Sequence, residues 1–148
     1  MFNIRLANKD DIKKVFDLSN DDVVRNNSIN KNKIEWEDHV KWFSERIKNI
    51  NEPFYIVEDE NKNFIAQVRF NKEDDGFVIS VSIEKNYRGK GQGGQIIIEA
   101  TEKLKHRPVI AYVKKDNIPS QKSFAKAGYK LNENKIINSE TYFIYVLN

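Results

Sequence analysis

Residues 88–94 read Arg88-Gly89-Lys90-Gly91-Gln92-Gly93-Gly94, and the interpretation of the whole chain starts from this loop. Residues 77–83 before it form an apolar, strand-like run, and residues 91–105 after it repeat apolar side chains at helical spacing. Glycines let a backbone approach a ligand closely, and the free N–H groups at a helix start attract a phosphate. Arg88 and Lys90 add positive charge. The loop is therefore predicted to bind a pyrophosphate.

A dinucleotide is the first alternative for this loop, because Gly89 to Gly94 also satisfies the G-x-G-x-x-G fingerprint. A dinucleotide-binding unit needs an acidic residue at the end of the next strand to hold a ribose, but here that strand runs into Val113-Lys114-Lys115. The segment 54–83 is also predicted to be an antiparallel meander with short polar turns, not a parallel sheet. A Walker loop is excluded because no Gly-Lys-Ser/Thr follows.

The remaining pattern predicts a mixed α/β (α+β) fold in which residues 1–148 form a single domain. Strands are expected at 3–7, 54–59, 64–71, 77–83, 109–113 and 141–147. Helices are expected after a cap at residue 8 and at 35–48, 91–105 and 120–127. A strand that follows a helix usually runs parallel to the strand before it. We therefore expect a mostly antiparallel sheet of six or seven strands, about four helices, and one parallel pair beside the loop.

Composition narrows the class of protein. The 25 basic and 22 acidic residues leave a net charge of +3, which is too small to indicate nucleic acid as a partner. The chain has no cysteine, so disulfides, thiolate metal ligands and an acyl-cysteine intermediate are excluded, and we expect no metal. A reducing, cytoplasmic location is expected. No signal peptide and no membrane-spanning segment are expected, because no apolar run approaches about 18 residues.

A second motif lies downstream: Asn117-x-x-Ser120-x-x-x-Phe124-x-x-x-Gly128-Tyr129. Together with Arg88-x-x-Gly91-x-Gly93, it resembles the GCN5-related N-acetyltransferase (GNAT) family. That family carries R/Q-x-x-G-x-G/A and N-x-x-S/A-x-x-x-Y-x-x-x-G-F at the same spacing, and its order of strands and helices agrees with the predicted order over nearly the whole chain. The resemblance implies a GNAT fold and direct transfer of an acetyl group from acetyl-coenzyme A to an amine.

The resemblance also assigns residues to the coenzyme. The loop would hold the pyrophosphate, backbone groups of the preceding strand would meet the pantetheine arm, and the second motif would lie against the arm and the thiol end. The expected cofactor-binding residues are Val81, Ile83, Arg88, Gly89, Lys90, Gly91, Gln92, Gly93, Gly94, Asn117, Ser120 and Phe124. Asn117 is also a natural cap for the helix that begins near Pro119.

The catalytic groups follow from the need for a neutral amine. Glu84, at the end of the strand beside the expected thioester, is the candidate base, and an exposed loop carboxylate is the alternative. Many relatives carry a Tyr that protonates the leaving thiolate where this chain has Phe124. The proton donor therefore stays open between water and a tyrosine from elsewhere, with Tyr87, Tyr112 and Tyr142 as options.

The acceptor is expected to be a small-molecule amine. The runs around Arg25-Asn26-Asn27-Ser28 and Trp36-x-x-His39-x-x-Trp42 look similar to a GNAT subgroup that acetylates UDP-linked 4-amino sugars. Residues expected to bind the acceptor are Asn26, Ser28, His39, Trp42 and Arg69. A protein, polyamine or antibiotic amine, and a non-catalytic acyl-CoA-binding module, remain alternatives. The sequence leaves the oligomeric state open, with a homodimer as one option.

Overall fold

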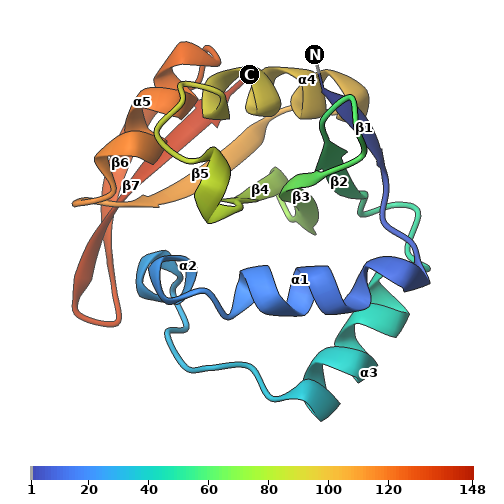
Figure 1. The fold of residues 1–148 in the computed structure, drawn as a ribbon. Helices are drawn as coiled ribbons and strands as arrows, with labels where there is room; N and C mark the ends of the chain where they lie inside the picture. The colour runs from blue at the N-terminus through green and yellow to red at the C-terminus, as the bar shows by residue number, and fades with distance from the viewer. Residues whose placement is uncertain (1) are drawn as a thin grey trace.

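The computed structural model describes residues 2–148, which are arranged around one seven-stranded sheet with the order β1-β2-β3-β4-β5-β7-β6. The strands are β1 (Asn3–Leu6), β2 (Phe54–Glu58), β3 (Phe64–Glu73), β4 (Gly76–Ile83), β5 (Val109–Lys114), β6 (Lys130–Ile137) and β7 (Glu140–Leu147). The α-helices are α1 (Ile12–Ser19), α2 (Asp22–Asn27), α3 (Trp36–Arg46), α4 (Gly93–Leu104) and α5 (Ile118–Lys126). Two short 3-10 helices, η1 (Lys9–Asp11) and η2 (Lys85–Tyr87), complete the order. Helices α4 and α5 lie over one face of the sheet, and α1, α2 and α3 lie under the other (Figure 1).

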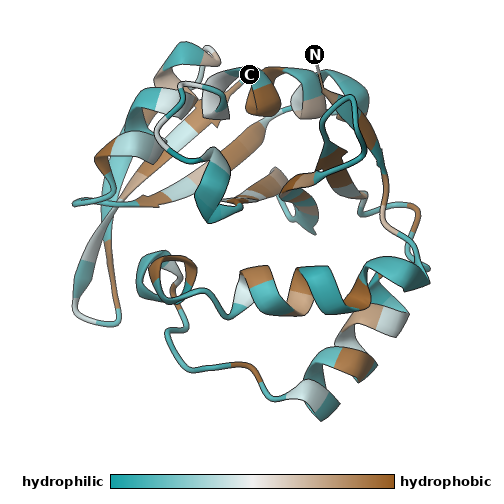
Figure 2. Ribbon diagram, in the orientation of Figure 1, coloured by the Kyte–Doolittle hydropathy of each residue, from teal (hydrophilic) through white to brown (hydrophobic). Residues whose placement is uncertain are grey.

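Alternation along the strands gives the sheet two apolar faces. Toward α4 and α5, Val68 and Phe70 of β3 join Ile96 and Ala100 of α4 in the larger buried cluster. Toward α1 and α3, a smaller cluster contains Val15, Phe43, Phe54 and Ile56. The brown inward stripes and teal outer surfaces of the helices show this division (Figure 2). Burying a large apolar side chain contributes about 1.5–3 kcal/mol, so both clusters hold helices to the sheet.

Strands β4 and β5 form the parallel pair that the sequence predicts, and they stay paired only briefly. The register joins Phe77 to Val109 and Val78 to Ile110 and then stops. Beyond that point β5 pairs along its whole length with β7, and β4 pairs with β3. The edge of β4 that faces β5 therefore carries backbone groups without a strand partner from Ile79 to Ile83 among the described residues. Such an edge is available to a ligand that binds through backbone hydrogen bonds.

The predicted fold class is confirmed, and the differences lie in weakly patterned segments. Helix α2 was not expected, because six residues with no buried side chain carry no apolar periodicity. Its N-cap, Asp21, accepts hydrogen bonds from Val23 N and Val24 N, so capping rather than burial of an apolar face stabilises the helix. Strand β6 is a full strand although nearly all of it is exposed. No helix in the described part of the chain has the length and hydropathy to cross a bilayer.

Candidate active site

The glycines of the loop divide into two pairs. Gly89 and Gly91 have φ of 73° and 72°, in the left-handed region, and a Cβ at either position would meet no atom within 4 Å. A Cβ on Gly93 would lie 2.6 Å from Ser123 Oγ, and one on Gly94 would lie 2.7 Å from Lys126 Cδ. The first pair therefore shapes an open backbone loop, and the second lets α4 approach α5.

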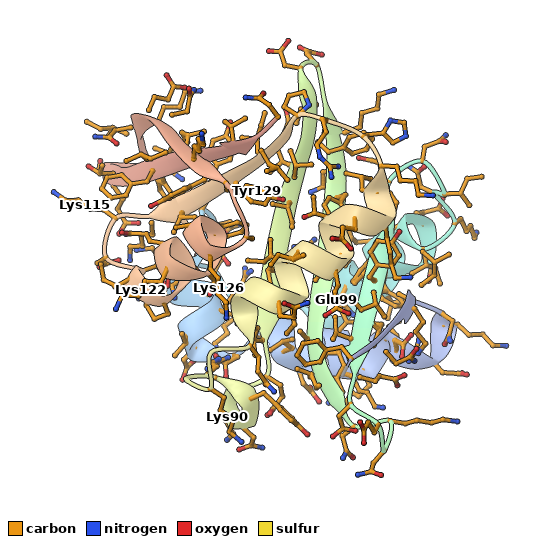
Figure 3. All side chains as sticks on the ribbon, turned by 90° about the horizontal axis from the view of Figure 1, so that it is seen from above. Lys90, Glu99, Lys115, Lys122, Lys126 and Tyr129 are labelled. Atoms are coloured by element: carbon orange, nitrogen blue, oxygen red, sulfur yellow. The ribbon has the colours of Figure 1, made fainter. Side chains whose placement is uncertain are left out.

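The open side of the loop is positively charged. Lys126 reaches from α5 and donates a hydrogen bond to the carbonyl of Gly91 at 3.4 Å, and Lys90 Nζ lies 5.6 Å from the centre of the Tyr87 ring. Figure 3 shows Lys122 and Lys126 on α5 beside the start of α4, with Lys90 on the loop. The free N–H groups at the start of α4 add to this positive potential. These features fit a pyrophosphate.

The loop residues Arg88 and Gln92 are both directed partly inward. Arg88 Nε donates to the Ile83 carbonyl at 2.8 Å, and its Nη2 donates to Asp21 Oδ1 at 2.9 Å. Three of the five N–H donors of the guanidinium remain for a ligand. Gln92 stands at the N-cap of α4, and its Oε1 is buried with no partner within residues 2–148. Their role toward coenzyme A stays a prediction.

The second motif forms the first turns of α5. Asn117 Oδ1 accepts a hydrogen bond from Ser120 N at 3.4 Å and caps the helix. Phe124 is buried, with its ring 5.1 Å from that of Tyr129 in an edge-on arrangement and 6.4 Å from that of Tyr145. On β4, the side chains of Val81 and Ile83 pack partly against the α4 cluster, which leaves their backbone at the edge toward β5. The loop follows the C-terminal end of β4 and the second motif follows the C-terminal end of β5, so both lie at the end where these parallel strands have separated.

Glu84 lies between β4 and the loop and is already hydrogen bonded. Its Oε2 accepts from Asn86 N at 2.8 Å, so the carboxylate caps η2. The side chain is half-buried, and its role as a base stays a prediction.

The candidate proton donors differ in their environment. The hydroxyl of Tyr87 donates to Asp59 Oδ2 at 3.2 Å, and Tyr142 is 2 % exposed. Tyr112 is half-buried and has no side-chain hydrogen bond within the described residues. Because Ala111 and Tyr145 pair on the α4 face, alternation directs Tyr112 to the face that α2 covers. Within residues 2–148, Tyr112 is therefore half-buried with a hydroxyl that no side chain uses, whereas the Tyr87 hydroxyl is bound by Asp59 and Tyr142 is buried.

His39 is enclosed by aromatic rings. It is 1 % exposed, and its Nε2 donates to the Ile12 carbonyl at 2.8 Å. The rings of Phe16, Trp36, Trp42 and Phe43 lie 5.2, 5.8, 5.9 and 5.5 Å from it. Burial lowers the pKa of His39 below its ordinary value and keeps the ring neutral at pH 7. An acceptor could touch this side chain only if the covering rings moved.

Arg69 occupies the same side of the sheet without a carboxylate partner. Its guanidinium carbon lies 5.0 Å from the centre of the Trp42 ring, and Nη2 donates to Ser80 Oγ at 3.4 Å. Burial, together with the positive charges of Arg46 and Arg25, lowers the pKa of Arg69 to about 10. No ion pair involves any of these three arginines within residues 2–148.

Asn26 and Ser28, the other two predicted acceptor residues, lie at the end of α2. Ser28 Oγ donates to the Val24 carbonyl at 2.6 Å and accepts from Arg25 at 3.2 Å, so its hydroxyl is used internally. The Asn26 carbonyl accepts from Lys114 Nζ at 3.2 Å, and its side-chain amide has no partner within the described residues. The structure thus brings Asn26 and Ser28 together, as it brings Trp42 and Arg69 together.

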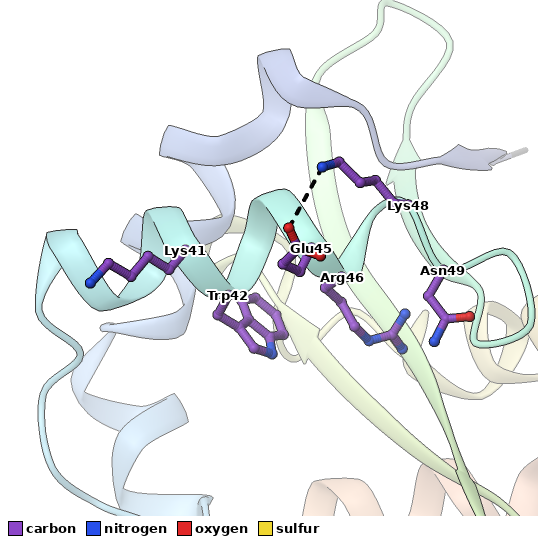
Figure 4. A pocket seen from close by; sticks show the side chains of 6 residues that line it. All are labelled: Lys41, Trp42, Glu45, Arg46, Lys48 and Asn49. Carbon is purple, nitrogen blue, oxygen red and sulfur yellow. Dashed lines mark ion pairs between the residues drawn. The ribbon is translucent and has the colours of Figure 1, made fainter.

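Two open hollows lie near these groups. One of about 670 Å³ runs beside α3 and is lined by Lys41, Trp42, Glu45, Arg46, Lys48 and Asn49 (Figure 4). Figure 4 shows the Trp42 and Arg46 side chains pointing from α3 toward β3. The other, of about 340 Å³, is lined by Lys114, Lys115, Asp116, Glu140 and Thr141. Neither lining includes a residue of the loop 88–94, so neither hollow is the pyrophosphate site. Within residues 2–148, no three His, Asp or Glu side chains are grouped to hold a metal.

Comparison with known proteins identifies this arrangement. Residues 15–129, which contain both motifs, match the model of the acetyltransferase (GNAT) family. This chain belongs to the GNAT family. It is accordingly an acetyl-CoA-dependent N-acetyltransferase.

Individual GNAT proteins resemble this chain in sequence and in fold. "Putative phosphinothricin acetyltransferase YwnH" of Bacillus subtilis (strain 168) is 30 % identical over 139 residues, which are 85 % of this chain and 82 % of that protein. A spermidine N-acetyltransferase from Vibrio cholerae, solved with CoA and spermine, superposes with a TM-score of 0.84 at 17 % identity, covering 98 % of this chain and 92 % of the other. An N-acetyltransferase from Staphylococcus aureus Mu50 superposes with a TM-score of 0.79 at 20 % identity, covering 100 % and 98 %. The two structural likenesses support the GNAT fold.

Three residues near the site escaped sequence reasoning. Asp21 joins the loop arginine to α2, Lys114 joins β5 to α2, and Arg46 lies near Arg69. Asp21 carried a usable signal, because an Asp two residues before a Val pair is a typical helix cap. Lys114 and Arg46 carried none, since the carbonyls of Asn26 and Phe70 that they bind are far away in the sequence, and any residue provides a carbonyl.

Proposed function

We propose that this chain, acting as one acyltransferase domain over residues 1–148, acetylates the primary amine of a small molecule that also carries a negative charge. Bound acetyl-CoA supplies the acetyl group as a thioester. The loop 88–94 would hold the pyrophosphate, the edge of β4 near Val81 and Ile83 would receive the pantetheine arm, and Asn117 and Ser120 would border it.

The environment of Arg69 carries the proposal for an anionic acceptor. A half-buried guanidinium that lacks a carboxylate is costly, and a ligand anion would supply the missing partner. Arg25 and Arg46 increase the positive potential at the same place. A polyamine, which is a polycation, would meet repulsion there. An acceptor with a phosphate, phosphinate or carboxylate group suits the charges of these residues best.

Two acceptors meet this description. A UDP-linked 4-amino sugar has a diphosphate for Arg69 and a flat uracil ring for the exposed part of Trp42, which is 38 % exposed. The side-chain amide of Asn26 offers a further hydrogen bond for a sugar hydroxyl. Phosphinothricin carries both a phosphinate and a carboxylate, and the similarity to YwnH favours it as the second candidate.

Glu84 remains our candidate for the base and Tyr112 for the proton donor. The carboxylate of Glu84 stands directly after β4 and accepts a hydrogen bond from Asn86 N at 2.8 Å. A thiolate leaves readily because a thiol has a pKa of about 8.5, so weak assistance from Tyr112 or water would suffice.

The test compares acceptors and one charge substitution. The purified chain is incubated with acetyl-CoA and a UDP-4-amino sugar, phosphinothricin or spermidine while free thiol is measured. We expect turnover of an anionic acceptor and little with spermidine. Arg69→Met should raise the acceptor KM by about 10- to 100-fold, the effect of a lost charge-assisted hydrogen bond, without changing the KM for acetyl-CoA.

Lys72→Met is the matched control, because it removes a positive charge from an exposed position on the same strand. Preference for spermidine, or equal effects of the two substitutions, would refute an anionic acceptor. Acetyl-CoA binding without thiol release on any of these amines would refute the proposed reaction.

A cytoplasmic location and a homodimer belong to the same proposal. The first is supported by dependence on acetyl-CoA, an intracellular metabolite. The second is supported by β6, an edge strand on which Leu131 is 53 % and Ile136 is 77 % exposed, because the unpaired backbone of an edge strand is a template for pairing. Light scattering coupled to size-exclusion chromatography should give twice the monomer mass for the unchanged protein and the monomer mass for Ile136→Lys.

A further inference from the structure

Helix α2 is anchored at both ends to the two strands that separate from each other. At its start, Asp21 Oδ1 accepts from Arg88 at 2.9 Å, and Arg88 also binds the carbonyl of Ile83, the last residue of β4. At its end, the Asn26 carbonyl accepts from Lys114, the last residue of β5. Helix α2 therefore lies across the place where β4 and β5 have separated (Figure 1).

One carboxylate oxygen serves both the helix and the loop. Asp21 Oδ1 accepts from Val23 N at 3.0 Å and from Val24 N at 3.2 Å in addition to Arg88. Burial acts to raise the pKa of Asp21, but the hydrogen bonds from Val24 and Arg88 outweigh it and hold the pKa below its ordinary value. At neutral pH the group is a carboxylate, so the cap of α2 and the ion pair form together.

The ion pair leaves Arg88 able to bind a second anion. Its Nε and one N–H of Nη2 are used by Ile83 and Asp21, and three N–H donors remain. A phosphate on those donors would not need to displace Asp21. It would instead immobilise a side chain that already holds the start of α2.

We propose that Asp21 is a positioning residue that couples the coenzyme loop to helix α2, so that binding of coenzyme A at the loop fixes the helix that carries Arg25 and Asn26. The inference uses the proposed function only in treating α2 as the acceptor side. Coupling between two sites is reciprocal, so an ordered α2 also tightens the hold on the coenzyme.

Hydrogen–deuterium exchange of the amides of α2, with and without saturating coenzyme A, tests the coupling directly. In the unchanged protein, coenzyme A should slow exchange over residues 22–27 at least about threefold. Asp21→Asn keeps a capping oxygen for Val23 and Val24 but removes the charge that holds Arg88. This variant should bind coenzyme A about threefold to fivefold more weakly, and at saturation most of the protection of residues 22–27 should be lost.

Asp22→Asn is the matched control. It makes the same charge change one residue away, on a side chain that is 94 % exposed and pairs with Lys33. It should show the full protection of the unchanged protein. Equal protection in Asp21→Asn, equal loss in Asp22→Asn, or no protection in the unchanged protein would overturn the inference.

The outcomes also separate this inference from the proposed function. If coenzyme A binds and the amines are acetylated but α2 exchange is unaffected, the coupling is wrong and the function stands. If coenzyme A does not bind, measured by calorimetry, both fail. Without ligand, the exchange rate of α2 and the unfolding midpoint of Asp21→Asn should stay close to those of the unchanged protein, because the cap is preserved. Faster exchange together with a lower midpoint would show that Asp21 has a structural role alone.

Discussion

The two pairs of loop glycines should respond differently to the same small substitution. In Gly93→Ala the new Cβ would lie 2.6 Å from Ser123 Oγ and 3.3 Å from Ser123 Cβ. The first distance is roughly 1 Å shorter than an optimal contact, so the side chain or α5 must shift. Overpacking of this kind costs about 1–3 kcal/mol, and the better helix propensity of Ala returns up to about 1 kcal/mol. We expect a net loss of about 1–2 kcal/mol in the free energy of unfolding.

Ser123→Ala supplies the matched rescue. It removes the Oγ and leaves only the 3.3 Å approach of the Cβ, so Gly93→Ala should cost less than about 0.5 kcal/mol in that background. Gly91→Ala should cost about 1–2 kcal/mol because its φ of 72° is left-handed, and Ser123→Ala should not rescue it because nothing lies within 4 Å. Urea unfolding of the three single variants and of the two double variants with Ser123→Ala measures these differences. A full cost for Gly93→Ala in the Ser123→Ala background would refute the contact as the cause.

Three further predictions concern other parts of the chain. Glu84→Gln should lower kcat chiefly at low pH, where more of the amine is protonated, and a uniform loss at every pH would instead indicate the capping role toward Asn86. Burial acts to raise the pKa of Asp11, but hydrogen bonds from Arg5 and Asn8 outweigh it and hold the pKa below its ordinary value. The ionised group therefore stabilises the fold above about pH 4, and this stabilisation is lost as the pH falls through the folded pKa. Urea unfolding at pH 7 and pH 3 should show that Asp11→Asn is less stable at pH 7 and less sensitive to acid; an unchanged acid sensitivity would contradict this. Tyr129→Phe leaves the buried Thr101 hydroxyl without its partner at 2.8 Å and should cost about 1–3 kcal/mol by thermal or urea unfolding, and no loss would show that the hydroxyl is satisfied elsewhere.

Most of the sheet could be predicted from the sequence because burial imposes a readable period. Residues 54–58 and 109–114 are nearly all buried and appear as apolar runs, and residues 93–104 repeat apolar side chains along one helical face. Helix α2 and strand β6 lacked such a period because they bury almost nothing. When a helix or strand is stabilised by a cap or by pairing with a neighbouring strand rather than by the core, the hydropathy of its sequence gives little indication that it forms.

The glycines of the loop occupy two different environments, although one reason was given for all of them. We expected all of them to let the backbone approach the phosphate, and the positions of Gly89 and Gly91 agree with that reason. Gly93 and Gly94 meet Ser123 and Lys126 instead. A motif that is read only as ligand chemistry therefore includes positions that are fixed by packing of α4 against α5. No spacing in the sequence distinguishes the two kinds, because the partner residues are about 30 positions away.

The donor side and the acceptor side of the site differ in what specifies them. In the proposed function, backbone groups of β4 and the loop would approach the donor, and backbone geometry leaves a signature of glycines at fixed spacing. The acceptor side is specified by side chains whose meaning depends on what surrounds them: Arg69 would be an ordinary surface arginine if one carboxylate lay beside it. Its significance is the missing counter-charge, which is a property of the folded neighbourhood. If the proposed acceptor is right, this chain indicates its coenzyme through a motif, whereas its acceptor is specified by charges that the fold leaves unpaired.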